Sequence, residues 1–229
     1  MKTMNLAASR LGVLCALAMT SAFAAAATVS DTFDAGPTLA WGNESGNWSA
    51  AGGNYGAGAP ANFPNAYTSL AYELTQFELA VDIAGISDGG VWVHSTHTGT
   101  GTIGVRGILL VTLGNSLYWH DVTNDSSYGA SINVANAGAY SRLRVTVADN
   151  GAGFSYAAYV DGGASPVTQY ASASFASGQA ALYSNSAQRF DNFTLTGSDA
   201  EVPPVPLPAA AWLLAPGLAA LGVRRKLQS

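Results

Sequence analysis

The stretch RLRVTVADNGAGFSYAAYV, which runs from Arg142 to Val160, decides the fold class. In both of its halves every second residue is apolar, which is the period of a strand with one buried face: Leu143, Val145 and Val147, then Phe154, Tyr156, Ala158 and Val160. Between the halves, Asp149-Asn150-Gly151 is typical of a tight hairpin turn. The stretch therefore predicts two antiparallel strands.

The same kind of pattern recurs through the middle of the chain, where no helical period is convincing. Phe77, Leu79, Val81 and Ile83 alternate with Glu78, Ala80 and Asp82. Further strands are expected at 91–95, 104–113, 116–121, 167–175, 179–184 and 190–196. Many short strands with Gly- and Asp-rich turns predict an all-β sandwich or barrel, and of these we expect the two-sheet antiparallel sandwich. Two stacked sheets also account for the continuously apolar run 108–111.

The composition suits one exported β-domain. Of 229 residues only 10% are charged, and 26 are glycine. That length allows a domain of about 150–200 residues with a sizeable core. The single cysteine, Cys15, lies near the N-terminus in an apolar run. A processed chain would therefore have no disulfide and would depend on core packing.

The N-terminal residues 1–27 have the features of a secretory signal peptide. Lys2 and Arg10 are basic, an apolar run covers 11–19, and Ala22-Phe23-Ala24 begins a small-residue stretch. This order suits signal peptidase, and cleavage is expected between Ala24 and Ala27. The alternative, a membrane anchor, is disfavoured because so short a run does not span a bilayer comfortably.

The last residues, 205–229, combine a short motif, an apolar segment and a basic end. The motif is Val205-Pro206-Leu207-Pro208-Ala209, and Arg224-Arg225-Lys226 ends the apolar segment. This order resembles the PEP-CTERM sorting signal in its VPLPA variant. The resemblance implies a transmembrane segment with a cytoplasmic basic tail, and processing by an exosortase-type enzyme. It also implies a Gram-negative host, with transient inner-membrane anchoring before delivery to the cell surface or matrix. A permanent anchor is the alternative.

The charge balance of the remaining domain excludes one class of partner. Five of the nine basic residues belong to the two ends, and the domain at 28–198, followed by a linker at 199–204, keeps four arginines and no lysine. It keeps nearly all of the fourteen acids. An acidic surface repels phosphate backbones, which argues against nucleic-acid binding.

The order of short motifs in the domain resembles the concanavalin A-like lectin/glucanase jelly roll. An opening Asp31-Thr32-Phe33-Asp34 is followed by Gly46-Asn47-Trp48-Ser49, then by the strands above, and the set closes with 190–195, Phe-Asp-Asn-Phe-Thr-Leu. The motifs are short, so the resemblance supports the fold more than the function. It also implies a structural calcium ion, held by Asp31 or Asp34 together with Asp191. The alternative is that Asp191 only ends a turn.

No catalytic constellation is evident. Glu78 and Asp82 share a strand face, but Ala80 stands where a glucanase-like motif would have its middle acid, so both are expected on a solvated face. His94 and His97 lack an evident third metal ligand, and no nucleophile motif accompanies them. The sequence therefore predicts no enzyme.

Aromatic residues are the candidates for sugar contact, because they stack on pyranose faces. The proposed contacts are Trp92, His94, Trp119 and His120, with Tyr118 beside them. Alternation places Trp92 and His94 on one face, opposite Val91 and Val93. The aromatic stretch 41–63 is expected to be a surface loop.

Three functions remain open at this point. The first is a non-catalytic carbohydrate-binding module of the cell surface or matrix, with exopolysaccharide as partner. The second is a glycoside hydrolase-like enzyme, which would need two carboxylates about 5–10 Å apart in a cleft. The third is a purely structural envelope protein, whose sheet faces would offer no groove.

Overall fold

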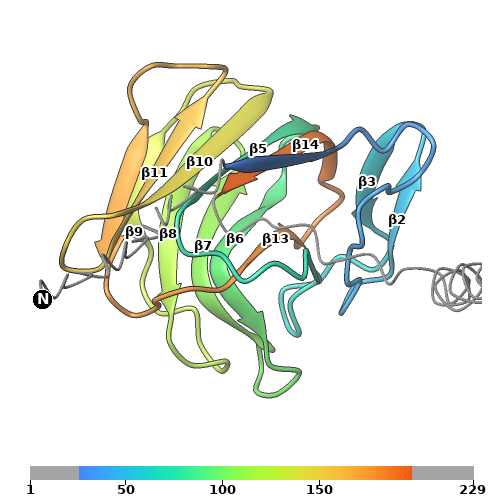
Figure 1. Cartoon of the computed structure of the whole chain (residues 1–229). Coiled ribbons are helices and arrows are strands. Elements are labelled where there is room, and N and C mark those ends of the chain that lie inside the picture. The colour runs from blue at the N-terminus through green and yellow to red at the C-terminus, as the bar shows by residue number, and fades with distance from the viewer. Residues whose placement is uncertain (1–25, 198–229) are drawn as a thin grey trace, which may run out of the picture.

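The structure, a computed structural model, describes residues 26–197, and these form an all-β domain of two antiparallel sheets (Figure 1). The expected signal peptide and sorting signal lie outside the described residues, apart from residues 26 and 27. Within the described part, no helix is long and apolar enough to cross a membrane.

The first sheet has eight strands, with β12, β11, β10, β5, β14, β3 and β2 side by side and β1 paired to β14. Its strands are β1 (Ala27–Asp31), β2 (Trp48–Ala51), β3 (Asn54–Ala57), β5 (Phe77–Ala84), β10 (Arg142–Asp149), β11 (Phe154–Val160), β12 (Thr168–Ser172) and β14 (Arg189–Gly197).

The second sheet has six strands in the order β4, β13, β6, β7, β8 and β9. They are β4 (Tyr67–Ser69), β6 (Asp88–His97), β7 (Val105–Leu113), β8 (Ser116–Val122), β9 (Ile132–Asn136) and β13 (Gln179–Ser184). Every strand expected from the sequence is present. The strands not foreseen are β1, β2, β3, β4 and β9, each of five residues or fewer.

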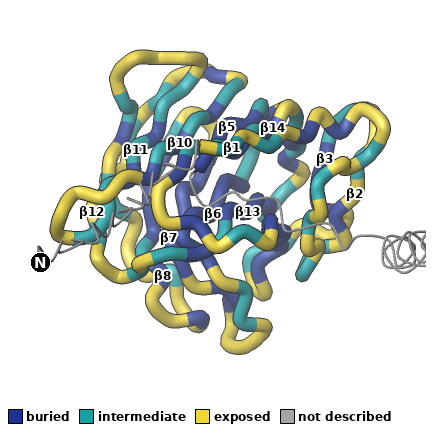
Figure 2. The backbone as a smooth tube through the Cα atoms, in the orientation of Figure 1, coloured by how far each residue is buried: buried dark blue, intermediate teal, exposed yellow. Residues whose placement is uncertain are grey.

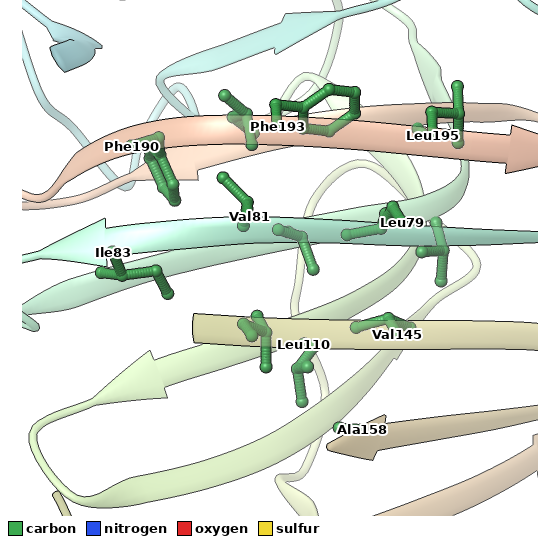
Figure 3. Close-up of a cluster of buried hydrophobic side chains, with 14 of the residues drawn as sticks. Leu79, Val81, Ile83, Leu110, Val145, Ala158, Phe190, Phe193 and Leu195 are labelled. Carbon is green, nitrogen blue, oxygen red and sulfur yellow. The ribbon is translucent and has the colours of Figure 1, made fainter. Parts of the chain in front are cut away.

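The shared core lies between the two sheets, where Figure 2 shows the buried parts of the strands. As the alternation predicted, Leu79, Val81 and Ile83 of β5 point into it beside Val145 of β10 (Figure 3). Leu110 of β7 packs against them from the other sheet. The alternation of buried and exposed residues therefore explains how the strands of the eight-stranded sheet are oriented. The other face of this sheet carries two ion pairs, Glu78 with Arg144 and Asp82 with Arg142.

The six-stranded sheet is apolar on both faces. One face contributes residues such as Val91, Val93 and Trp119 to the shared core. The opposite face carries a second buried group, the outer cluster, made of Tyr67, Trp92, Ile103, Val105, Leu109, Val111, Val122, Ala181 and Tyr183. Such a face needs a cover, and here loops supply it rather than a third layer.

The covering loops are bonded to each other and to the outer cluster. The Asn65 amide donates to the carbonyl of Ile103 (2.9 Å), and the Ile103 amide donates to that of Asp125 (2.7 Å). Trp92 Nε1 donates to Asn65 Oδ1 (3.1 Å), while Asn65 Nδ2 donates to the Tyr128 hydroxyl (2.6 Å). The loops are thereby held at fixed positions over the sheet.

The stretch 41–63 is not simply a surface loop, because β2 and β3 form a hairpin within it. Trp48 and Tyr55 of this hairpin are buried in the shared core. Tyr55 stacks on Phe33 with ring centroids 4.8 Å apart, and Trp41 meets Phe193 edge-on at 4.9 Å. These aromatic contacts bury the hairpin. Each of its strands has only four residues, too few to show the alternation of apolar and polar residues that predicts a strand.

Asp31 anchors the segment that precedes this hairpin. Its side chain is 1% exposed and accepts four hydrogen bonds. The donors are the backbone amides of Phe33, Thr38 and Leu39 and the indole Nε1 of Trp41, at 2.9–3.2 Å. A carboxylate is suited to this position because it only accepts, and all four partners only donate.

We expect Asp31→Ala to lower the free energy of unfolding by about 3 kcal/mol or more, because it leaves several buried N–H groups unpaired. Urea denaturation of the two chains measures the difference. Asp34→Ala, which removes an exposed carboxylate nearby, is the control and should change stability by less than about 0.5 kcal/mol. Equal losses in both variants would contradict the anchoring role.

Candidate functional site

The candidate site is a shallow hollow on the outer face of the six-stranded sheet. Its volume is about 60 Å³, and Leu109 and Val111 of β7 contribute its apolar surface. Six residues with polar groups complete the lining: Asn62, Asp88, Tyr118, His120, Tyr128 and Tyr183. Pockets that enclose a small molecule usually measure about 300–1,000 Å³. This hollow therefore suits a ligand that rests against it, not one that is engulfed.

The aromatic side chains of the hollow form a continuous row. Tyr118 and His120 project from the same face of β8, because they are two residues apart, and their rings meet edge-on at 5.4 Å. His120 lies 5.4 Å from Tyr128, and Tyr128 lies 5.6 Å from Phe63. Phe63 is 55% exposed, so the row extends from the hollow onto the open surface.

Hydrogen bonds hold three aromatic rings of the hollow in place, those of His120, Tyr128 and Tyr183. The Tyr128 hydroxyl donates to the backbone carbonyl of Asn62 (3.0 Å), and the Tyr183 hydroxyl donates to Asn62 Oδ1 (3.1 Å). His120 Nδ1 lies 3.1 Å from the carbonyl of Tyr128. Because a carbonyl only accepts, Nδ1 carries the proton in this contact. The surface is thus pre-formed, which reduces the entropy lost on binding.

Ionisation in the hollow is governed by burial and by Asp88. Burial lowers the pKa of His120, although the nearby carbonyls of Tyr128 and Ala130 act in the opposite direction. The imidazole is accordingly neutral at pH 7. Burial raises the pKa of Tyr118, with the Asp88 charge adding to the rise, and raises that of Tyr128 to about 12. The tyrosines therefore remain protonated donors.

Of the candidates for sugar contact expected from the sequence, Tyr118 and His120 line the hollow. Trp92 and Trp119 are each 0% exposed, so neither can stack on a ligand in this structure. Trp92 belongs to the outer cluster beneath the loops, and Trp119 belongs to the shared core. The prediction of tryptophan platforms is therefore wrong: the loop cover hides one indole and alternation buries the other. Tyr118 is on the exposed side because it alternates with Trp119.

His94 does not share a face with Trp92, contrary to the expected alternation. The pairing of β6 with β7 shifts register between Val93 and Thr96, and His94 has a positive φ of 47°. This bulge turns the side chain toward the other sheet, where Nδ1 lies 3.0 Å from the Tyr156 hydroxyl. Nε2 lies 2.8 Å from the carbonyl of Thr75, so it carries the proton. His94 is a buried structural residue.

The expected calcium ligands are not assembled into a site. Both carboxylate oxygens of Asp31 already accept N–H donors. Asp34 is exposed, and Asp191 Oδ1 accepts the amide of Asn192 (2.7 Å). Across residues 26–197, no group of three or more His, Cys, Asp or Glu residues could hold a metal ion. The residues present thus do not fit the calcium site that the resemblance implied.

The lining residues that were not predicted from the sequence come from four separate loops or strands. Asn62 and Tyr128 lie on the covering loops, Tyr183 on β13, and Asp88 begins β6. Only Tyr118 and His120 could have been paired in advance, through their positions two apart in one strand. The other four are brought to them by long-range pairing and loop packing.

Solved structures with similar folds show which architecture this is. No model of a protein family matches the sequence, and no curated protein matches it. The exoplasmic/lumenal domain of VIP36 in its calcium-bound form is 7% identical, with a TM-score of 0.50 over 78% of this chain and 92% of that one. The likeness at this identity concerns the fold alone.

Two further structures are less similar. The carbohydrate-binding module CBM66 from Bacillus subtilis is 13% identical, with a TM-score of 0.45 over 69% of this chain and 92% of that one. A GH43 protein from Bacillus licheniformis is 14% identical, with a TM-score of 0.49 over 73% of this chain and 39% of that one. The two-sheet jelly roll expected from the sequence is confirmed as the fold class.

The burial of His94 predicts a pH-dependent stability. Burial lowers its pKa from the usual 6.5, so the folded protein favours the neutral ring. Below about pH 6.5 the unfolded chain binds more protons than the folded one, and stability falls as the pH drops from about 7 to about 5. We expect His94→Asn, which suits the positive φ, to reduce this loss.

Chemical denaturation at several pH values measures the effect. Some dependence of the unfolding free energy on pH should remain in His94→Asn. It should be weaker still in a double variant with His120→Gln, because burial lowers the pKa of His120 as well. If the unfolding free energy of both variants depends on pH as strongly as that of the unchanged protein, neither ring changes its protonation on folding.

Proposed function

We propose that this chain is an exported cell-surface or matrix protein whose jelly-roll domain binds carbohydrate at the hollow, without catalysis. The observation that carries the binding proposal is the row of aromatic rings beside Asn62 and Asp88. Rings stack on the apolar faces of sugars, while amide, carboxylate and hydroxyl groups exchange hydrogen bonds with sugar hydroxyls. The shallow shape suits a polysaccharide lying across the surface.

The fold likeness is compatible with this proposal, since a carbohydrate-binding module is among the similar structures. The lining of the hollow is what supports binding. A hydrolase would need two carboxylates at the site, and Asp88 is the one carboxylate among the residues that line the hollow in the described part of the chain. The hollow therefore favours binding over hydrolysis.

Export and sorting are proposed from the two ends of the sequence. The features of residues 1–27 support secretion through signal peptidase. Val205-Pro206-Leu207-Pro208-Ala209, the apolar segment and the basic end support transient anchoring in the inner membrane and processing by an exosortase-type enzyme. A Gram-negative cell envelope or its extracellular matrix is then the destination, and an exopolysaccharide is the ligand that such a destination offers.

We expect Tyr118→Ala to weaken binding to a retained polysaccharide on the order of tenfold, because it removes a ring from the hollow. Residues 26–198 contain both sheets and the shared core, and affinity electrophoresis through polysaccharide gels measures the retardation. Tyr159→Ala, on β11 of the other sheet, is the control and should migrate like the unchanged domain. Equal retardation of all three proteins would contradict the site, and no retardation in any gel would contradict the binding function.

A variant that lacks residues 205–209 tests the sorting proposal. In cells that contain an exosortase-type enzyme, we expect it to remain uncut in the membrane fraction, whereas the intact chain is shortened and leaves that fraction. Immunoblots of fractionated cells measure both size and location. If the variant and the intact chain have the same size and distribution, the motif is not a processing signal.

A further inference from the structure

The charge of the hollow points to a particular class of sugar. Asp88 lines the hollow, whereas no arginine or lysine of residues 26–197 does. Three of the four arginines of the described domain are paired elsewhere: Arg106 with Asp125, Arg142 with Asp82 and Arg144 with Glu78. Since His120 is neutral, the hollow carries a net negative charge at pH 7.

Asp88 is held in place by a turn from the neighbouring strand end. Its Oδ2 accepts from Asn185 Nδ2 (2.7 Å), and its backbone amide donates to Ser186 Oγ (2.8 Å). The backbone carbonyl accepts the amides of Asn185 and Ser186, both at 3.0 Å. These bonds leave Oδ1 without a hydrogen-bond partner among residues 26–197. A carboxylate fixed in this way is pre-organised for a ligand donor.

The aromatic rings reinforce the preference for positive charge. The faces of tyrosine rings attract cations through their quadrupole, and Tyr118, Tyr128 and Tyr183 line the same hollow as Asp88. The Asp88 charge also reaches all three rings, since it contributes to the raised pKa of each hydroxyl. An anionic sugar, such as a uronate or a sulfated residue, would be repelled here.

We propose that the hollow binds polysaccharide with free amino groups, the ammonium of a 2-amino-2-deoxy sugar pairing with Asp88. This inference rests on the proposed function, because it names the ligand class of the same site. A neutral sugar can use the aromatic row and Asn62, but it leaves the Asp88 charge unpaired. N-acetylation removes the positive charge and with it the pairing.

The probes are three oligosaccharides of equal length: a glucosamine oligomer, its fully N-acetylated form and a glucose oligomer. Calorimetric titration at about pH 6, where the amine is protonated, measures their affinities for residues 26–198. We expect the glucosamine oligomer to bind on the order of tenfold more tightly than the other two. Asp88→Asn should remove this advantage, so that the glucosamine oligomer binds this variant no more tightly than the two neutral oligomers do.

Asp34→Asn is the matched control, because it removes the same charge from an exposed position outside the hollow. If it reduces glucosamine binding as much as Asp88→Asn, the attraction is a general effect of the acidic surface and the inference is wrong. If the N-acetylated or glucose oligomer binds as tightly as the glucosamine oligomer, the inference is also wrong, although carbohydrate binding stands. If no oligosaccharide and no polysaccharide binds a domain with a normal thermal transition, the proposed function itself fails.

Discussion

The six-stranded sheet must bury apolar side chains on both of its faces, and the rest of the structure depends on this constraint. The eight-stranded sheet covers one face and forms the shared core. The other face, with Trp92, Leu109 and Val111, is left to the covering loops. The hollow lies over this face between the loops, and Leu109 and Val111, both buried, are among the residues that line it. Fold stability and the candidate site therefore arise from the same apolar surface.

Polar groups buried with these loops determine how rigid the site is. Trp92 Nε1, Asn65 and the Tyr128 hydroxyl form a chain of hydrogen bonds from the sheet to the edge of the hollow. Breaking one link would leave buried donors or acceptors unpaired, which costs more than the bond itself contributes. Asp31 performs the same function for the segment before the β2–β3 hairpin. In both places a polar side chain fixes irregular backbone that no strand pairing holds.

How far the sequence predicts this molecule depends on the range of the interactions concerned. Alternation is local, so the strands around Leu79, Val145 and Tyr156 and their buried faces were predicted correctly. It fails at His94, where a bulge with positive φ reverses the side chain. It also cannot show that loops bury Trp92, because the loop residue Asn65, which accepts the hydrogen bond of its indole, is 27 positions away in the sequence.

The candidate site likewise has one part that the local sequence pattern predicts and one part that depends on long-range contacts. Tyr118 and His120 are two apart in one strand, so their common face follows from the sequence. Asp88 and Asn62 reach them only through the pairing of β6 with β7 and β7 with β8 and through the loop cover. The electrostatic character of the hollow was therefore not predictable, although the acidic character of the whole domain was.

The central claim is that ligand contact occurs at the hollow on the outer face of the six-stranded sheet. An NMR titration of the isotopically labelled domain, residues 26–198, with an oligosaccharide tests this claim directly. The account predicts that the largest shift changes fall on Asn62, Asp88, Tyr118 and Tyr128, with the face that carries Arg142 and Arg144 unaffected. Changes centred on that opposite face, with the hollow unchanged, would contradict it.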